Sequence, residues 1–340
     1  MKALATALFV LAAWVGPAVS QEAVAAHQTP EAPGQAVAAE LQTPAARLKL
    51  DTSLVSVDVL VTDKSGRVVK GLNSANFRIY DNGVPQKIAS FGPSSDPITV
   101  VILMEFSAAS YGYFAARAAA WSDSFLNHLE PRDWVALVTF DLRTKVQVDF
   151  THNRAEVHNT LATIGTTSFR EIDLYDALTD TLEMLDGISG KKSILLVATG
   201  WNTFSSSTFD DVRKRLQRSD ATIFSVGLAE IEAIRSYSPG IGYLQAQNTL
   251  RTFSRQTGGF AMFPRFESEL PGIFEDVVAF ERNLYNLTFR IPQAGRDGRY
   301  HKLKVEVIGP DGKPLQITDE KGRKRTVEAH AREGYTAPRE

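Results

Sequence analysis

The stretch Thr99–Ser110 constrains most strongly how this chain can fold. It contains five consecutive apolar residues, Val100–Met104, which are too few to span a membrane and rich in β-branched types. Such a run is typical of a strand buried on both faces, the usual central strand of a parallel sheet. Ligands in open α/β sheets bind at the carboxyl ends of the strands. We therefore expect Glu105, Ser107 and the loop that follows to lie where a binding site would form.

Strand and helix patterns alternate from residue 96 to residue 283. Six predicted strands and six predicted helices favour an α/β fold with a doubly wound, mostly parallel six-stranded sheet. Two of the helices begin at candidate capping pairs, Asn153 with Glu156 and Thr208 with Asp211.

The two flanking segments, residues 47–95 and 284–340, show the alternating pattern of antiparallel strands. Valines occupy every second position from 55 to 61, and Gln86–Phe91 is a further predicted strand. The first segment alone has few strands with which to cover a core. We therefore expect both segments to pair into one antiparallel β-sandwich, with the α/β domain inserted into it or packed beside it.

Residues 1–20 have the features of a cleaved secretory signal peptide: Lys2, an apolar run to about Val15, and the small residues Ala18–Ser20. Residues 21–46 are rich in Ala, Pro, Gln and Glu and predict a disordered leader. No later apolar run approaches the roughly 20 residues that a transmembrane helix needs. The sequence therefore predicts an exported protein, periplasmic or extracellular, whose mature chain has no membrane span.

Composition argues against several classes of protein. The net charge is -2, and acidic and basic residues are interspersed along the chain. The sequence therefore lacks the clustered positive charge with which proteins bind nucleic acid or an anionic membrane. The one basic run, Lys321–Arg325, is interpreted as a solvated hairpin tip.

The chain has no cysteine, which excludes disulfides and a lipid anchor on cysteine. Its six histidines are scattered without metal-ligand spacing, and no nucleophile–base signature is visible. We therefore expect no enzyme.

Several short motifs occur in a fixed order along the chain. They are Asp63-Lys64-Ser65-Gly66, Asp81-Asn82-Gly83, Leu174-Tyr175-Asp176-Ala177-Leu178, Asp297-Gly298 with His301-Lys302-Leu303, and Arg332-Glu333-Gly334-Tyr335. Taken together and in order, they resemble those of a von Willebrand factor type A domain. The resemblance is specifically to secreted bacterial proteins in which one β segment precedes that domain and another follows it, and it covers about residues 48–338.

The resemblance implies a metal-ion-dependent adhesion site at five positions, which here are Glu105, Ser107, Ala109, Ile172 and Thr199. The family's usual ligands at these positions are Asp, Ser, Ser, Thr and Asp. Only the serine at 107 is kept, while Ala109 and Ile172 carry no side-chain oxygen. Because Mg²⁺ requires oxygen ligands in near-octahedral geometry, we expect a degenerate site and no bound cofactor.

With a degenerate site, we expect the loop face of the α/β domain to bind a protein partner. The candidate binding residues are Glu105, Ser107, Ser110, Tyr113, Thr199, Trp201, Asn202 and Phe204. Exposed aromatic side chains commonly anchor interfaces, although Trp201 and Phe204 could instead pack under their loop.

Three functions remain from the sequence. The first is an exported, non-enzymatic protein-interaction or adhesion module that needs no metal. The second is a metal-dependent adhesion protein in which Glu105, Ser107 and rebuilt neighbours hold Mg²⁺ or Ca²⁺. The third, ranked last, is a hydrolase that uses the same face.

Overall fold

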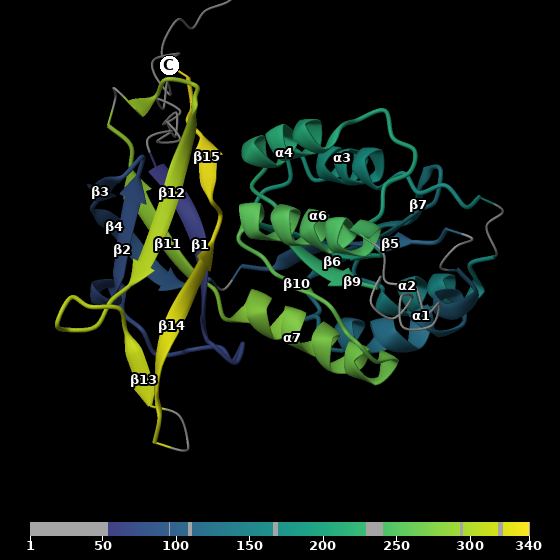
Figure 1. The fold of residues 1–340 in the computed structure, drawn as a ribbon, viewed down its shortest axis with the longest axis horizontal. Helices are drawn as coiled ribbons and strands as arrows, with labels where there is room; N and C mark the ends of the chain where they lie inside the picture. Colours follow the sequence, from purple (N-terminus) through teal and green to yellow (C-terminus); the bar gives the residue numbers. More distant parts are fainter. Residues whose placement is uncertain are drawn as a thin grey trace, which may run out of the picture. The chain divides into compact units, whose positions relative to one another are not determined.

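Strand β5 (Ile98–Glu105) is the central strand of the structure, and all eight of its residues are buried. Successive side chains of a strand point to opposite faces of its sheet. Val100 and Ile102 accordingly join one apolar cluster, and Val101 and Leu103 join another. Because both faces are apolar, both need a covering layer of helices, and Figure 1 shows helices on the two sides of the sheet.

The computed structural model describes residues 54–94, 96–107, 111–165, 169–228, 241–292, 295–318 and 322–339. The predicted signal peptide, 1–20, and leader, 21–46, lie outside these ranges, as do Ala109 and Ser110. The side chain of Tyr113 is also outside the description.

The sheet around β5 has six strands in the order β10-β9-β8-β5-β6-β7. All neighbouring strands are parallel except β6 and β7, which pair antiparallel at one edge. The predicted α/β fold class, with a mostly parallel six-stranded sheet, is therefore confirmed. Besides β5, its strands are β6 (Trp134–Phe140), β7 (Thr144–Thr151), β8 (Lys191–Ala198), β9 (Thr222–Gly227) and β10 (Ala261–Met262).

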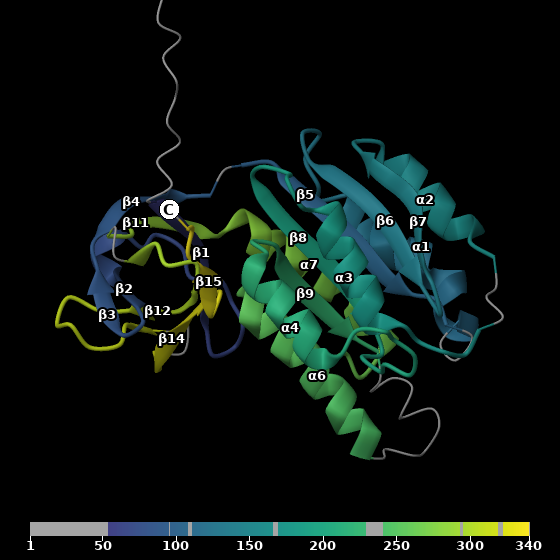
Figure 2. The same ribbon diagram turned by 90° about the horizontal axis from the view of Figure 1, so that it is seen from above.

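Helices from the described residues pack on both faces of this sheet (Figures 1 and 2). None of the helices in these ranges is long and apolar enough to cross a membrane. The apolar cluster on one face includes α1 (Tyr111–Leu126), α2 (Arg154–Thr163) and α7 (Leu270–Arg282). The cluster on the other face includes α3 (Leu174–Met184), α4 (Phe209–Arg218) and α6 (Ile241–Thr257).

The two predicted capping pairs differ in outcome. Thr208 and Asp211 form a complete capping box at the start of α4. At the start of α2, the Asn153 side chain accepts a hydrogen bond from the Glu156 N–H. The Glu156 carboxylate does not complete that box, and instead accepts from the Thr151 hydroxyl at 3.4 Å. Only half of the predicted box at α2 is therefore present.

The flanking segments form one antiparallel β-sandwich, as predicted. Strand β1 pairs on one side with β11 and on the other with β14, so both ends of the described chain contribute to one sheet. The five-stranded sheet has the order β13-β14-β1-β11-β4, and the four-stranded sheet the order β15-β12-β2-β3. Their strands are β1 (Leu54–Asp63), β2 (Phe77–Asp81), β3 (Val84–Gln86), β4 (Ile88–Pro93), β11 (Tyr285–Arg290), β12 (Tyr300–Val307), β13 (Gln316–Thr318), β14 (Lys324–Ala331) and β15 (Gly334–Thr336).

The predicted single strand Gln86–Phe91 is wrong, because the structure divides this stretch at Lys87. Residues before Lys87 belong to β3, which pairs with β2, and residues after it belong to β4, which pairs with β11. The chain crosses from one sheet of the sandwich to the other at this point. Alternation of side chains along the sequence cannot distinguish one strand from two strands in different sheets.

Candidate functional site

Glu105 ends β5, and its carboxylate is held by two other residues of the predicted site. The Ser107 hydroxyl donates to one carboxylate oxygen at 2.9 Å. The other oxygen accepts from the Thr199 backbone N–H at 2.8 Å and from the Thr199 hydroxyl at 2.7 Å. Thr199 directly follows β8, which pairs with β5, so two parallel strands bring these groups together at their carboxyl ends.

These three side chains lie below the surface. Glu105 is 1% exposed, Ser107 0% and Thr199 2%. A buried carboxylate needs several hydrogen bonds to offset the loss of hydration. The network therefore stabilises the ends of β5 and β8 against one another.

Among the described residues, the oxygen groups at this position are one carboxylate and two hydroxyls, and the hydroxyls donate to the carboxylate. The side chain of Ile172 is 2% exposed and packs with α3 and α4 in the apolar core. No group of three or more His, Cys, Asp or Glu side chains within the described ranges could hold a metal ion.

The loop that follows Thr199 is tied to the main chain of Ile172. The N–H groups of Thr203 and Phe204 both donate to the Ile172 carbonyl, at 2.9 Å and 3.1 Å. The Thr203 hydroxyl accepts from the Ile172 N–H at 2.8 Å. Position 172 therefore anchors this loop through its backbone while its side chain fills the core.

The start of α3 holds the same loop through the N-cap Asp173 and the Tyr175 N–H, which contact Ser205 and Asn202 of the loop. The Ser205 hydroxyl lies within hydrogen-bonding distance of Asp173 and of Asn202 Oδ1, the latter at 2.6 Å, and donates its one proton to either acceptor. Asn202 Oδ1 also accepts from the Tyr175 N–H at 3.3 Å. Burial raises the pKa of Asp173, and the neighbouring carboxylate of Asp176 adds to this effect.

Asp176 completes the attachment of the loop to α3. Its two carboxylate oxygens accept from the N–H groups of Ser206 and Ser207 at 2.7 and 2.8 Å. Burial would raise the pKa of Asp176, but the hydrogen bonds from Ser207 and Ser206 outweigh burial and lower it. The loop backbone from Thr203 to Ser207 is thus fixed at both ends.

Two aromatic side chains project from this fixed loop. Phe204 is 62% exposed and does not pack under the loop. Trp201 is 38% exposed, and its indole N–H donates to the Gly242 carbonyl at the start of α6, at 3.3 Å. The structure thus brings Glu105, Ser107, Thr199, Trp201, Asn202 and Phe204 to the same end of the sheet.

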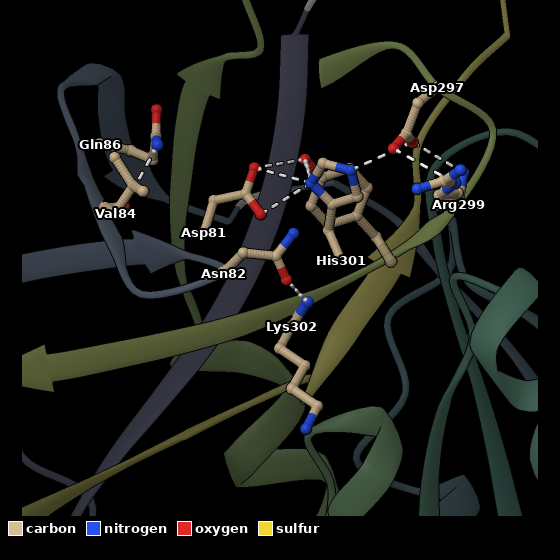
Figure 3. Close-up of polar contacts among 9 residues, drawn as sticks. Asp81, Asn82, Val84, Gln86, Asp297, Arg299, His301 and Lys302 are labelled. Carbon is tan, nitrogen blue, oxygen red and sulfur yellow. Dashed lines mark hydrogen bonds and ion pairs between the residues drawn. The ribbon is translucent and has the colours of Figure 1, made fainter. Parts of the chain in front are cut away.

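A second polar cluster, which the sequence did not single out as a site, lies in the sandwich (Figure 3). His301 Nδ1 contacts the Asp81 carboxylate at 2.8 Å, and His301 Nε2 contacts Asp297 at 3.2 Å. The Tyr335 hydroxyl donates to Asp81 at 2.9 Å. Asp81, His301 and Tyr335 are each less than 8% exposed, and they come from β2, β12 and β15. The cluster therefore joins three strands of one sheet.

The groups of this cluster hold one another through hydrogen bonds. Burial raises the pKa of Tyr335, and its hydrogen bond to Asp81 raises it further, so the phenol stays a donor. The Arg299 N–H and the His301 ring lower the pKa of Asp297. The groups pair with one another, and no serine or threonine hydroxyl is among them. Each of these residues lies in a motif that the sequence analysis noted. However, Asp81 is 220 residues from His301, and Tyr335 is 34 residues from it, so the sequence gave no sign that they meet.

Comparison with known proteins gives similarity in structure only. No model of a protein family and no curated protein matches this chain. It is similar to the von Willebrand factor domain of the type V pili tip protein Mfa5 from Porphyromonas gingivalis, with 13% identity over 54% of this chain and 94% of that one, and a TM-score of 0.42.

Two further solved structures show similarity at the same level. One is a von Willebrand factor type A protein from Catenulispora acidiphila, with 12% identity over 78% of this chain and 76% of that one, and a TM-score of 0.45. Another is the conserved hypothetical protein BatB from Bacteroides thetaiotaomicron, with 12% identity, coverage of 55% and 100%, and a TM-score of 0.40. The strand order and helix placement of this chain, not these similarities, define its fold.

Replacement of Thr199 by valine tests the Glu105 network. The variant removes the hydroxyl that donates to the buried carboxylate and accepts from the Trp201 N–H. We expect a loss of about 1–3 kcal/mol in the free energy of unfolding, measured with urea. Thr163→Val is the matched control, because that hydroxyl is exposed and bonds only to carbonyls of its own helix. Equal stability of the two variants would contradict the assigned role.

The Asp81 cluster is tested by a double-mutant cycle. Asp81→Ala leaves His301 and Tyr335 without their shared acceptor, and we expect it to cost about 3 kcal/mol. Tyr335→Phe should cost about 1 kcal/mol, and the two effects should not add, because both remove the same hydrogen bond. Additive losses in urea unfolding would show that the two residues act independently.

Proposed function

We propose that this chain is an exported, non-enzymatic protein-interaction module that binds a protein partner with the loop face of its α/β domain and needs no metal ion. The observation that carries the proposal is the pair of exposed aromatic side chains, Trp201 and Phe204, on a loop with a fixed backbone. Aromatic anchors that are held in place lose little conformational entropy on binding. Adhesion is one form that such binding takes.

The buried state of the neighbouring polar groups supports a binding function over a hydrolytic one. Among the described residues, the Ser107 and Thr199 hydroxyls donate to the Glu105 carboxylate, and all three side chains are buried. A nucleophile and its base must reach the reacting atom. The surface that a partner would meet here is therefore formed by the loop and not by the carboxylate.

Thermal unfolding with and without divalent ions tests independence from metal. We expect the same Tm in millimolar Mg²⁺, Mn²⁺ or Ca²⁺ and in chelator, because the Glu105 oxygens are bonded to Ser107 and Thr199. An ion at about 100 times its Kd would add about 2.7 kcal/mol and raise Tm by a few degrees. A rise of that size, abolished by Ser107→Ala, would establish the metal-dependent alternative instead.

The loop face is tested by capture of partners from cells that produce the protein. The mature chain serves as bait in three forms: wild type, Trp201→Ala with Phe204→Ala, and the control Val84→Ala. Val84 is 59% exposed but lies on β3 of the sandwich. We expect a protein captured by the wild type and the control to be lost, by more than tenfold, from the double variant. Equal capture by all three would place the interface elsewhere.

A further inference from the structure

Charged groups lie close to both connections between the sandwich and the α/β sheet. Residues 94–97 join β4 to β5, and residues 283–284 join α7 to β11. A cavity of about 250 Å³ lies beside the first crossing and the start of β11. Its lining includes Ser94 and Asp96 of the first crossing, Asn286 after the second, Asp58 of β1, Lys191 of β8, and Arg332 after β14. Charge in this region therefore bears on both connections at once.

Glu281, in the last turn of α7, is the unusual member of this region. Its side chain is 2% exposed, and neither carboxylate oxygen accepts a hydrogen bond of regular geometry from the described residues, with the Ser193 hydroxyl as the neighbouring donor. The nearby Lys191 ammonium donates to the backbone carbonyl of Glu281 at 2.7 Å. A buried carboxylate without regular hydrogen bonds is costly when ionised, and much less so when neutral.

The charged groups around Glu281 come from three elements. Lys191 faces it from β8, with the Ser193 hydroxyl, Asp58 faces it from β1, and Arg282 follows it on α7. Arg282 is itself paired with Asp133 and, at 3.6 Å, with Glu130.

Asp58 couples Glu281 to the rest of the junction. Its carboxylate accepts a hydrogen bond from the Asn286 side chain at 2.8 Å. The charges of Asp96 and Arg332 also act on its pKa, in opposite directions. Burial raises the pKa of Asp58. A negative charge on Asp58 disfavours a second one on Glu281.

Burial is the largest influence on Glu281 and raises its pKa to about 7. Lys191, Ser193 and Arg282 favour the ionised form, Asp58 opposes it, and burial outweighs the favourable groups. The ordinary pKa is 4.5, so the folded chain holds this proton more tightly than an opened one. The stability that the neutral acid contributes is complete below the ordinary pKa and is lost as pH rises through about 7.

We propose that protonation of Glu281 controls the junction between the sandwich and the α/β sheet: the neutral acid keeps the end of α7 closed, and the ionised carboxylate opens it. The negative charge of the ionised carboxylate lies at the C-terminal end of a helix, where the helix dipole also disfavours it. Ionisation therefore favours opening of this helix end. Helix ends open at lower free energy than cores, so the last turn of α7 and the crossing at 283–284 yield first.

Hydrogen exchange measures this opening directly. Amide protection of residues 277–286 is followed in the full mature chain from about pH 5.5 to about pH 8, with correction for the intrinsic exchange rate. A group whose pKa falls from about 7 to 4.5 on opening should reduce protection by about 30-fold over that range. Protection of β5 should change much less.

Glu281→Gln should abolish the pH dependence, since glutamine keeps the shape but cannot ionise. Glu275→Gln is the matched control, because Glu275 is on the same helix but exposed, and it should behave as wild type. Asp58→Asn removes the opposing charge and should move the midpoint of the loss to lower pH. An NMR titration of the Glu281 carboxyl in wild type gives the same midpoint without any substitution. Constant protection in wild type, or an unchanged loss in Glu281→Gln, would overturn the proposal.

Discussion

The pairing of β1 with β11 and β14 is the interaction on which the rest of the structure depends. Val59 lies opposite Tyr285 on one side and Ala331 on the other, so a strand from the start of the described chain is bonded to strands from its end. The α/β segment between them must therefore leave the sandwich and return to it. Closing the long loop between these strands costs conformational entropy before the strand contacts can form. This favours cooperative folding of the whole unit, residues 50–340.

The sandwich and the α/β sheet share packing at the crossings. Leu60 of β1 belongs to the same buried cluster as Ile98 of β5 and Val277 of α7. The charged groups Asp58, Lys191 and Glu281 lie beside this apolar contact. Because shared apolar burial stabilises the junction, it can retain a carboxylate whose ionisation opposes closure. A junction of this kind is stable and still responds to a single proton.

At the opposite end of the α/β sheet, the carboxyl ends of β5 and β8 converge, as they do in open sheets that bind ligands. Here the converging groups serve the protein itself. Glu105 is long enough to reach Thr199 on the next strand, and the hydrogen bonds that result fix the ends of both strands. The loop that leaves Thr199 is then held by Ile172, Asp173 and Asp176, which leaves its aromatic side chains as the groups offered to a partner.

The sequence by itself determined the features that depend on a few neighbouring residues. The apolar run before Glu105 defined a doubly buried strand, the spacing of Thr208 and Asp211 defined a helix start, and the order of elements defined the six-stranded sheet. It also placed Glu105 and, through the family resemblance, Thr199 at the ends of buried strands, and the structure showed that these strands are neighbours. Only the tertiary structure decided that the stretch around Lys87 serves two sheets, that Asp81 meets His301, and that Glu281 is buried without a regular hydrogen bond. The physical reason is that periodicity and capping are local, whereas strand register and burial depend on segments hundreds of residues apart, and a shift of one residue would turn each side chain to the other face.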